Sequence, residues 1–162
     1  MSRISQQRLL NAVFYNVYGM EFCSTNMDDK VMLQKAVFLM REQGVSCGDY
    51  EFVWYQYGPF SAELSDDMKM EIENEDRQAT VEFSSEAWTI MNRLKTAFAK
   101  DTAYSSRYWV EAIASVFYLK KYMYPSYDDA KIIQVLESKK KDLRNHEENI
   151  KAMNVLNEIL AS

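Results

Sequence analysis

The sequence predicts a mainly α-helical protein, a single-domain bundle of about seven helices with a small two-stranded β element near residues 50–57 and 79–83. Two observations lead to this fold class. The 162 residues include only four Gly and two Pro, which leaves few obligatory turns and favours helices over a many-stranded sheet. Apolar residues also recur at steps of three and four along most of the chain, the spacing of helices with one buried face.

Length and composition indicate one domain over residues 1–162. A chain of 162 residues can bury roughly 70% of the surface that it exposes when unfolded, which is enough for a hydrophobic core. The hydrophobic content of 48% is that of a globular protein and not of a disordered one. No repeat, low-complexity tract or long linker divides the chain.

Local signals mark where the predicted helices begin and end. Stop signals are Gly19, Gly44 and Pro125. N-cap candidates are Ser5, Asn26 or Asp28, Ser84 or Ser85, Tyr127 or Asp128, and Asn145. Asn145 with Glu148 three residues later also resembles a capping box. The helix within residues 107–122 has the widest apolar arc, so we expect it to be the most buried.

The run YEFVWYQY, residues 50–57, is the clearest β-strand candidate, because aromatic and β-branched residues prefer an extended backbone. Both of its faces carry aromatic side chains, which suggests that both are covered. Gly58 and Pro59 should end the strand at a corner, and Pro59 can open the first turn of the next helix. The segment QATVEF, residues 78–83, is a candidate partner strand of undecided direction.

The helix that follows Ser61 is predicted to have a thin apolar stripe, Leu64, Met68 and Ile72, under an acidic outer face. Two readings of that face stay open. It is either solvated or a docking surface for a basic partner.

Two motifs carry a family resemblance. LQKAVFLM at residues 33–40, followed by F-x-WY-x-YGPFS-x-EL at residues 52–64 and by Asp67, resembles the pattern of uncharacterised YwgA-type bacterial proteins. The pattern is similar, more distantly, to the Panacea domain of SocA-type antitoxins. The combination of LQK with YGPFS is more specific than either motif. The resemblance implies a small, mostly helical, non-enzymatic protein tied to toxin neutralisation or mobile elements.

Charge and cysteine usage exclude some classes of protein. The formal net charge of −5 would repel phosphate backbones, although a local basic patch stays compatible with it. No apolar run approaches the ~20 residues needed to cross a bilayer. Cys23 and Cys47 are the only cysteines, without metal-binding spacing, and are expected to be reduced thiols of a cytoplasmic protein.

A search for catalytic chemistry predicts no enzyme. His146 is the only histidine and falls in a charged turn, where an exposed residue in the first turn of a helix is the plainer reading. Neighbouring acids such as Asp28–Asp29 point about 100° apart on a helix, and helix-start charges explain them. Without a glycine-rich phosphate loop either, we predict no catalytic residue, no metal ion and no cofactor.

Two clusters are candidate binding sites. The aromatic cluster either packs the core around the Gly58–Pro59 corner or presents interface anchors to a partner. Its members are Trp54, Tyr55, Tyr57, Pro59 and Phe60. The basic group either is a solvated turn or contacts phosphate. Its members are Lys139, Lys140, Lys141 and Arg144.

We therefore expect a non-enzymatic module that binds a protein partner, such as a toxin or a protease substrate, and that neutralises or adapts it. The alternative is a DNA-associated transcriptional regulator with a winged-helix-like element that uses the basic group. No membrane association is expected.

Overall fold

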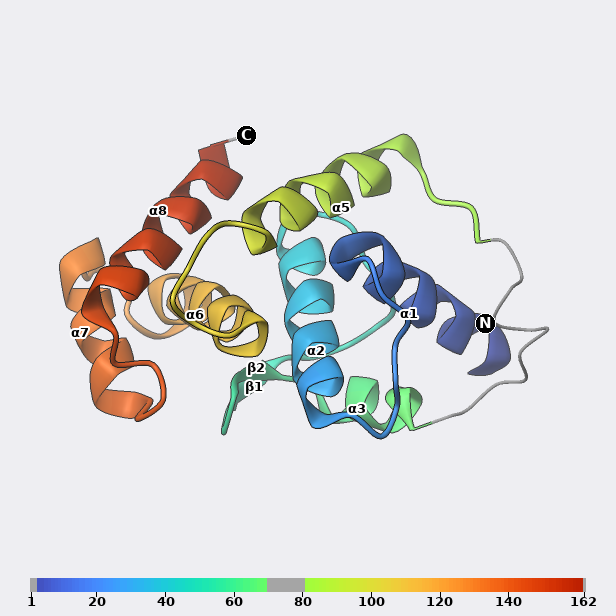
Figure 1. Cartoon of the computed structure of the whole chain (residues 1–162), viewed down its shortest axis with the longest axis horizontal. Coiled ribbons are helices and arrows are strands. Elements are labelled where there is room, and N and C mark those ends of the chain that lie inside the picture. Colours follow the sequence, from blue (N-terminus) through green and yellow to red (C-terminus); the bar gives the residue numbers. More distant parts are fainter. Residues whose placement is uncertain (1–2, 70–80, 162) are drawn as a thin grey trace.

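A computed structural model describes residues 3–69 and 81–161. Over these ranges the protein is mainly helical, with seven α-helices, one π-helical turn and one two-stranded antiparallel sheet, which confirms the predicted fold class (Figure 1). The elements are α1 (Arg3–Tyr18), α2 (Met27–Glu42), β1 (Val53–Tyr55), β2 (Gly58–Phe60), α3 (Ala62–Met68), α5 (Ser85–Phe98), α6 (Ser106–Tyr118), η1 (Leu119–Met123), α7 (Asp129–Lys139) and α8 (His146–Ala161).

Helices α2 and α6 form the centre of the fold. In Figure 1, α1 and α5 cover them on one side and α7 and α8 on the other, while the two strands and α3 lie along one edge. Every residue from Val31 to Met40 of α2 and from Trp109 to Phe117 of α6 is buried. The predicted burial of the helix within residues 107–122 is thus confirmed, and α2 shares the same role.

Side-chain caps start the helices largely where the sequence predicts. Asn26, Ser84 and Asp128 each accept a hydrogen bond from a backbone N–H in the first turn. Gly19 and Gly44 follow the ends of α1 and α2 in the left-handed conformation, at φ +75° and +98°. The prediction for Ser5 is wrong, because α1 already begins at Arg3.

The small sheet is a hairpin in which part of the aromatic run pairs with the residues that directly follow the run, so its predicted pairing is wrong. Val53 lies opposite Phe60, and Tyr55 lies opposite Gly58. Residues 81–83 form no strand, and residues 78–80 lie outside the described residues. The partner of β1 is the segment directly after a two-residue turn and not residues 79–83, because two strands can pair across a very short turn.

Gly58 makes this short turn possible. Gln56 and Tyr57 have negative φ, whereas Gly58 has φ +88°, which fits a type I turn followed by a glycine bulge. Pro59 therefore lies inside β2. The prediction that it opens the first turn of a helix is wrong. Helix α3 instead begins at Ala62, and Ser61 is its N-cap. The predicted continuation of this helix through Ile72 lies outside the described residues.

Candidate functional site: the aromatic hairpin

Residues 53–60, which we call the hairpin, and Ser61 directly after them are held to α2 by two neighbouring polar side chains. Gln34 pairs with Ser61 in both directions: its Nε2 donates to the Ser61 carbonyl at 2.9 Å, and its Oε1 accepts from the Ser61 N–H at 3.0 Å. Lys35 donates from Nζ to the Pro59 carbonyl at 2.8 Å. All these groups are buried. The LQK and YGPFS motifs therefore contact each other in the fold, because two side chains of the first bond to the backbone of the second.

A second lysine holds the tip of the hairpin from the end of α7. Lys140 Nζ donates to the Tyr55 carbonyl at 2.9 Å and also to the Gln56 carbonyl. The ammonium lies 4.8 Å from the centre of the Trp54 ring, within the range of a cation–π contact. Burial lowers the pKa of Lys140. Lys140 is thus a buried structural residue and not a member of an exposed basic group.

The other predicted basic residues face solvent. Lys139, Lys141 and Arg144 are exposed, and Arg144 Nε donates to the Glu137 carbonyl at 3.1 Å. The predicted phosphate-contacting group therefore separates into three exposed cations and one buried clamp. The sequence alone could not distinguish them, because all four belong to one charged run.

Beneath the hairpin lies a buried polar centre formed by Lys35 of α2 with Glu111 and Ser115 of α6. Their exposed fractions are 1%, 2% and 0%. Burial lowers the pKa of Lys35 and raises that of Glu111, while the attraction between the two groups opposes both shifts. Within the described part of the chain, Glu111 Oε1 and Ser115 Oγ have no hydrogen-bond partner.

The polar centre is sealed by Gly58. A Cβ atom built on Gly58 would lie 2.5 Å from Ser115 Oγ, so no larger residue fits without movement. Because these groups are almost fully buried, a substrate could reach them only if the hairpin moved. Of the three residues, Lys35 supports the hairpin directly through the Pro59 carbonyl, and Ser115 packs against Gly58.

The two faces of the hairpin differ in exposure, which corrects the expectation that both are covered. Trp54 packs inward on Tyr118, with ring centroids 5.9 Å apart, and its opposite residue Pro59 is buried. On the other face Val53 and Tyr55 are 55% and 57% exposed. Phe60 is half-buried and contacts Tyr55, with ring centroids 5.1 Å apart. Of the predicted partner-binding residues, Tyr55 is the one that is largely exposed.

Tyr57 belongs to the support of the hairpin more than to its exposed face. The Arg107 guanidinium lies 4.6 Å from the centre of its ring. Arg107 in turn forms an ion pair with Asp28 at the start of α2, at 3.1 Å. The turn residue is thereby tied to α2 and α6.

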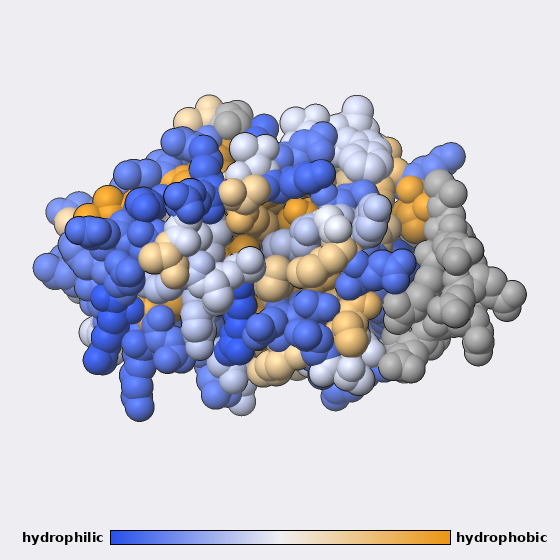
Figure 2. All heavy atoms as spheres, viewed as in Figure 1, coloured by the Kyte–Doolittle hydropathy of each residue, from blue (hydrophilic) through white to orange (hydrophobic). Residues whose placement is uncertain are grey.

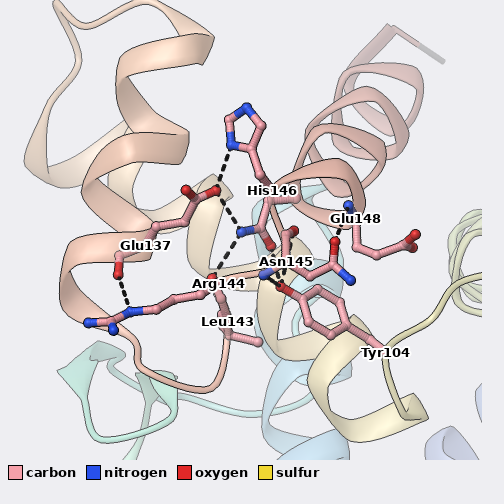
Figure 3. A network of polar contacts seen from close by, with 8 residues as sticks. Tyr104, Glu137, Leu143, Arg144, Asn145, His146 and Glu148 are labelled. Atoms are coloured by element: carbon pink, nitrogen blue, oxygen red, sulfur yellow. Dashed lines mark hydrogen bonds and ion pairs between the residues drawn. The ribbon is translucent and has the colours of Figure 1, made fainter.

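The sole histidine belongs to a polar network at the junction of α7 and α8 (Figure 3). His146 Nδ1 lies 2.9 Å from Glu137 Oε2. Asn149, which is fully buried, donates to the same oxygen at 3.0 Å and to the Leu143 carbonyl at 2.9 Å, and accepts from the Tyr104 hydroxyl at 2.7 Å. These bonds fix the turn between the two helices, and His146 is exposed, as predicted.

The predicted capping box at Asn145 is half formed. Asn145 Oδ1 accepts from the Glu148 N–H at 3.3 Å. The Glu148 carboxylate, however, accepts from Thr102 at 2.5 Å and from Lys151 at 3.0 Å. The Asn145 N–H donates instead to the Tyr104 hydroxyl at 3.1 Å.

Other kinds of site find little support in the described residues. Over residues 3–69 and 81–161, no group of three or more His, Cys, Asp or Glu could hold a metal ion. Within the same ranges, no helix is both long and apolar enough to cross a membrane. On the face of the molecule shown in Figure 2, apolar residues appear as small groups among hydrophilic ones.

Comparison with protein-family models, curated proteins and solved structures finds no match to this chain. The resemblance to YwgA-type proteins and the Panacea domain therefore stays a prediction from the two motifs.

Sequence reasoning missed three residues that define the hairpin. Gln34 and Lys35 were read only as part of a motif, and Val53 was not named as a binding residue. One signal was available for the first two. They are the only polar residues in the run Val31–Met40, which suggests buried polar contacts when every neighbour is apolar.

Proposed function

We propose that this chain is a cytoplasmic, non-enzymatic interaction module that binds a protein partner through the outer face of the hairpin. The outer face consists of Val53, Tyr55 and Phe60. The observation that carries the proposal is that an apolar, aromatic face stays exposed on a hairpin whose backbone is fixed by two buried lysines, Lys35 and Lys140, and is followed directly by Ser61, which Gln34 holds.

Rigidity and exposure together favour recognition. Tyr residues combine a large apolar area with a hydroxyl group, and they are enriched among the residues that dominate binding energy. A surface that is already ordered before binding loses less conformational entropy on association than a flexible one. The hairpin has both properties, because its inner face is packed while its outer face is free.

The motif resemblance supports a narrower form of the proposal. If the chain acts as SocA-type antitoxins do, the partner is a toxin or a protease substrate that is occluded or adapted by the outer face. The acidic residues after Ser61 that lie within α3, Glu63 and Asp66, are exposed beside the hairpin. Asp66 is paired with Lys69 at 3.3 Å, so α3 does not by itself select a basic partner.

Capture of a partner by the tagged full chain from its native host tests the proposal, with Tyr55→Ala and Tyr15→Ala compared side by side. Both tyrosines are 57% exposed, so the two substitutions remove similar exposed rings from different surfaces. We expect one protein to bind stoichiometrically to the wild type and to Tyr15→Ala, and to be lost with Tyr55→Ala at an unchanged melting temperature. Equal retention by both variants would refute the role of the outer face.

A second candidate function is DNA association. One observation favours it: Lys140 holds the tip of the hairpin, so the exposed cations Lys139 and Lys141 flank a strand pair in the manner of a wing. A mobility-shift assay decides between the two functions. No shift at ~50 mM salt would exclude DNA binding, because phosphate contacts are strongest at low salt.

A further inference from the structure

The outer edge of β1 carries backbone groups that no second strand satisfies. The sheet has only two strands in the described residues, so β1 pairs on one side alone. Opposite residues of an antiparallel pair alternate between hydrogen-bonded and non-hydrogen-bonded positions. Trp54 faces Pro59, which has no N–H and whose carbonyl accepts from Lys35 on the side away from β1. The pair Trp54–Pro59 is therefore non-hydrogen-bonded, and the Trp54 N–H and C=O point away from β2.

A hollow of about 250 Å³ lies at the start of β1, where Val53 lines it. It lies between Phe52 and Val53 on one side and Tyr118 and Tyr122 on the other, with the C-terminal end of α2 as its third wall. Five of its eight lining residues are apolar or aromatic, and the other three, Arg41, Glu42 and Glu51, are charged. A mixed lining of this kind can receive an apolar side chain of a peptide beside a polar one.

The hollow is lined by one cation, Arg41, and by two acids, Glu42 and the exposed Glu51, and these groups differ in their pairing. Glu42 is already engaged, because it accepts from Lys121 at 2.6 Å and from the Tyr122 hydroxyl at 2.5 Å. Arg41 is exposed and lies 5.8 Å from the centre of the Phe52 ring. Among the residues that the structure describes, Arg41 has no ion pair. An Arg in this state can form a two-pronged contact with a carboxylate.

We propose that the outer edge of β1 binds an extended segment of the protein partner as a third strand, with an apolar side chain in the hollow and a carboxylate on Arg41. The proposal rests on the function proposed above and specifies the partner as an extended, acidic peptide segment. An incoming helix would leave the Trp54 N–H and C=O unpaired, because its own backbone groups are bonded internally. An incoming strand pairs with both groups, as in other cases of strand addition to a sheet edge.

A displayed library of linear ten-residue peptides, selected against the full chain, tests this proposal. We expect enriched peptides with alternating apolar residues and at least one Asp or Glu. N-methylation of one peptide position at a time should weaken binding more than 10-fold at every second residue, because alternate amides of a strand face its neighbour. Docking by side chains alone would show no such alternation.

Charge reversal supplies the control on the protein side. Arg41→Glu should weaken the selected acidic peptides more than 10-fold, whereas Lys95→Glu should leave their affinity unchanged. Lys95 is also exposed, and its helix α5 lies far from the strands in Figure 1. Equal effects of the two substitutions would contradict the role of Arg41.

Three results would overturn the proposal. They are a selection that enriches no peptide, binding that is insensitive to N-methylation, and sedimentation that shows a dimer of this chain broken by Arg41→Glu, because a second copy would then occupy the edge. If these results appear while Tyr55→Ala still abolishes capture of the partner, strand addition is wrong and the proposed function stands. If that capture fails as well, both proposals are wrong.

Discussion

Substitution of Gly58 by Ala measures how closely the hairpin is seated on α6. At φ +88° a residue with a Cβ costs about 1–2 kcal/mol in the left-handed region. The new Cβ would also lie 2.5 Å from the buried Ser115 Oγ, and overpacking of this kind adds about 1–3 kcal/mol. We therefore expect Gly58→Ala to lower the free energy of unfolding by about 2–5 kcal/mol, in chemical denaturation followed by circular dichroism.

The double variant separates the two costs. Ser115→Ala removes the Oγ and leaves the Cβ of residue 115 at 3.7 Å, an ordinary contact distance. In the Ser115→Ala background, Gly58→Ala should then cost only the backbone part, about 1–2 kcal/mol. Ser115→Ala alone should be nearly neutral, because it deletes a buried hydroxyl that has no partner in the described residues. An unchanged cost of Gly58→Ala in the two backgrounds would refute the close seating.

Three further predictions concern the polar side chains that hold the fold. Lys140→Met should destabilise by about 2 kcal/mol, because it leaves two hairpin carbonyls without their donor, while Lys139→Met should change the free energy of unfolding by under about 0.5 kcal/mol. Asn149→Ala should cost about 2–4 kcal/mol through the network of Figure 3, whereas the exposed Asn154→Ala should cost almost nothing; similar melting temperatures for this pair would contradict the network. Burial lowers the pKa of Lys35 from 10.5 to about 7, so the unfolded chain binds more protons between these values and wild-type stability should rise with pH across that window. Urea unfolding at pH 7 and pH 9 should show a smaller rise in the free energy of unfolding for Lys35→Met, and an equal rise would contradict the lowered pKa of the buried Lys35 amine.

The helices were predictable because their signals are local. Apolar spacing located the buried faces, and short polar side chains such as Ser84 and Asp128 marked helix starts within one or two residues. Such signals depend on neighbours within a few positions, which a sequence displays directly. The wide apolar arc within residues 107–122 likewise predicted the buried helix α6.

The strand pairing and the polar contacts were not predictable in the same way. A β-prone run does not show whether its partner lies two or twenty residues away, so the segment near residues 79–83 was preferred to β2. The burial of Lys140 depends on the position of the hairpin tip, 84 and 85 residues earlier in the chain. Exposure of Tyr55 likewise depends on which face α6 covers. Those properties belong to the tertiary structure.

The affinity of the captured partner for the purified chain tests the central claim most directly. Wild type, Tyr55→Ala and Tyr15→Ala would be titrated with that partner in a calorimeter, after their melting temperatures have been matched. If the outer face of the hairpin is the recognition surface, Tyr55→Ala should raise the dissociation constant at least about 30-fold. This corresponds to the loss of roughly 2 kcal/mol of binding free energy that is typical of an anchor residue. Tyr15→Ala should change the dissociation constant less than about 2-fold. Equal affinities for the two variants would show that the partner binds elsewhere.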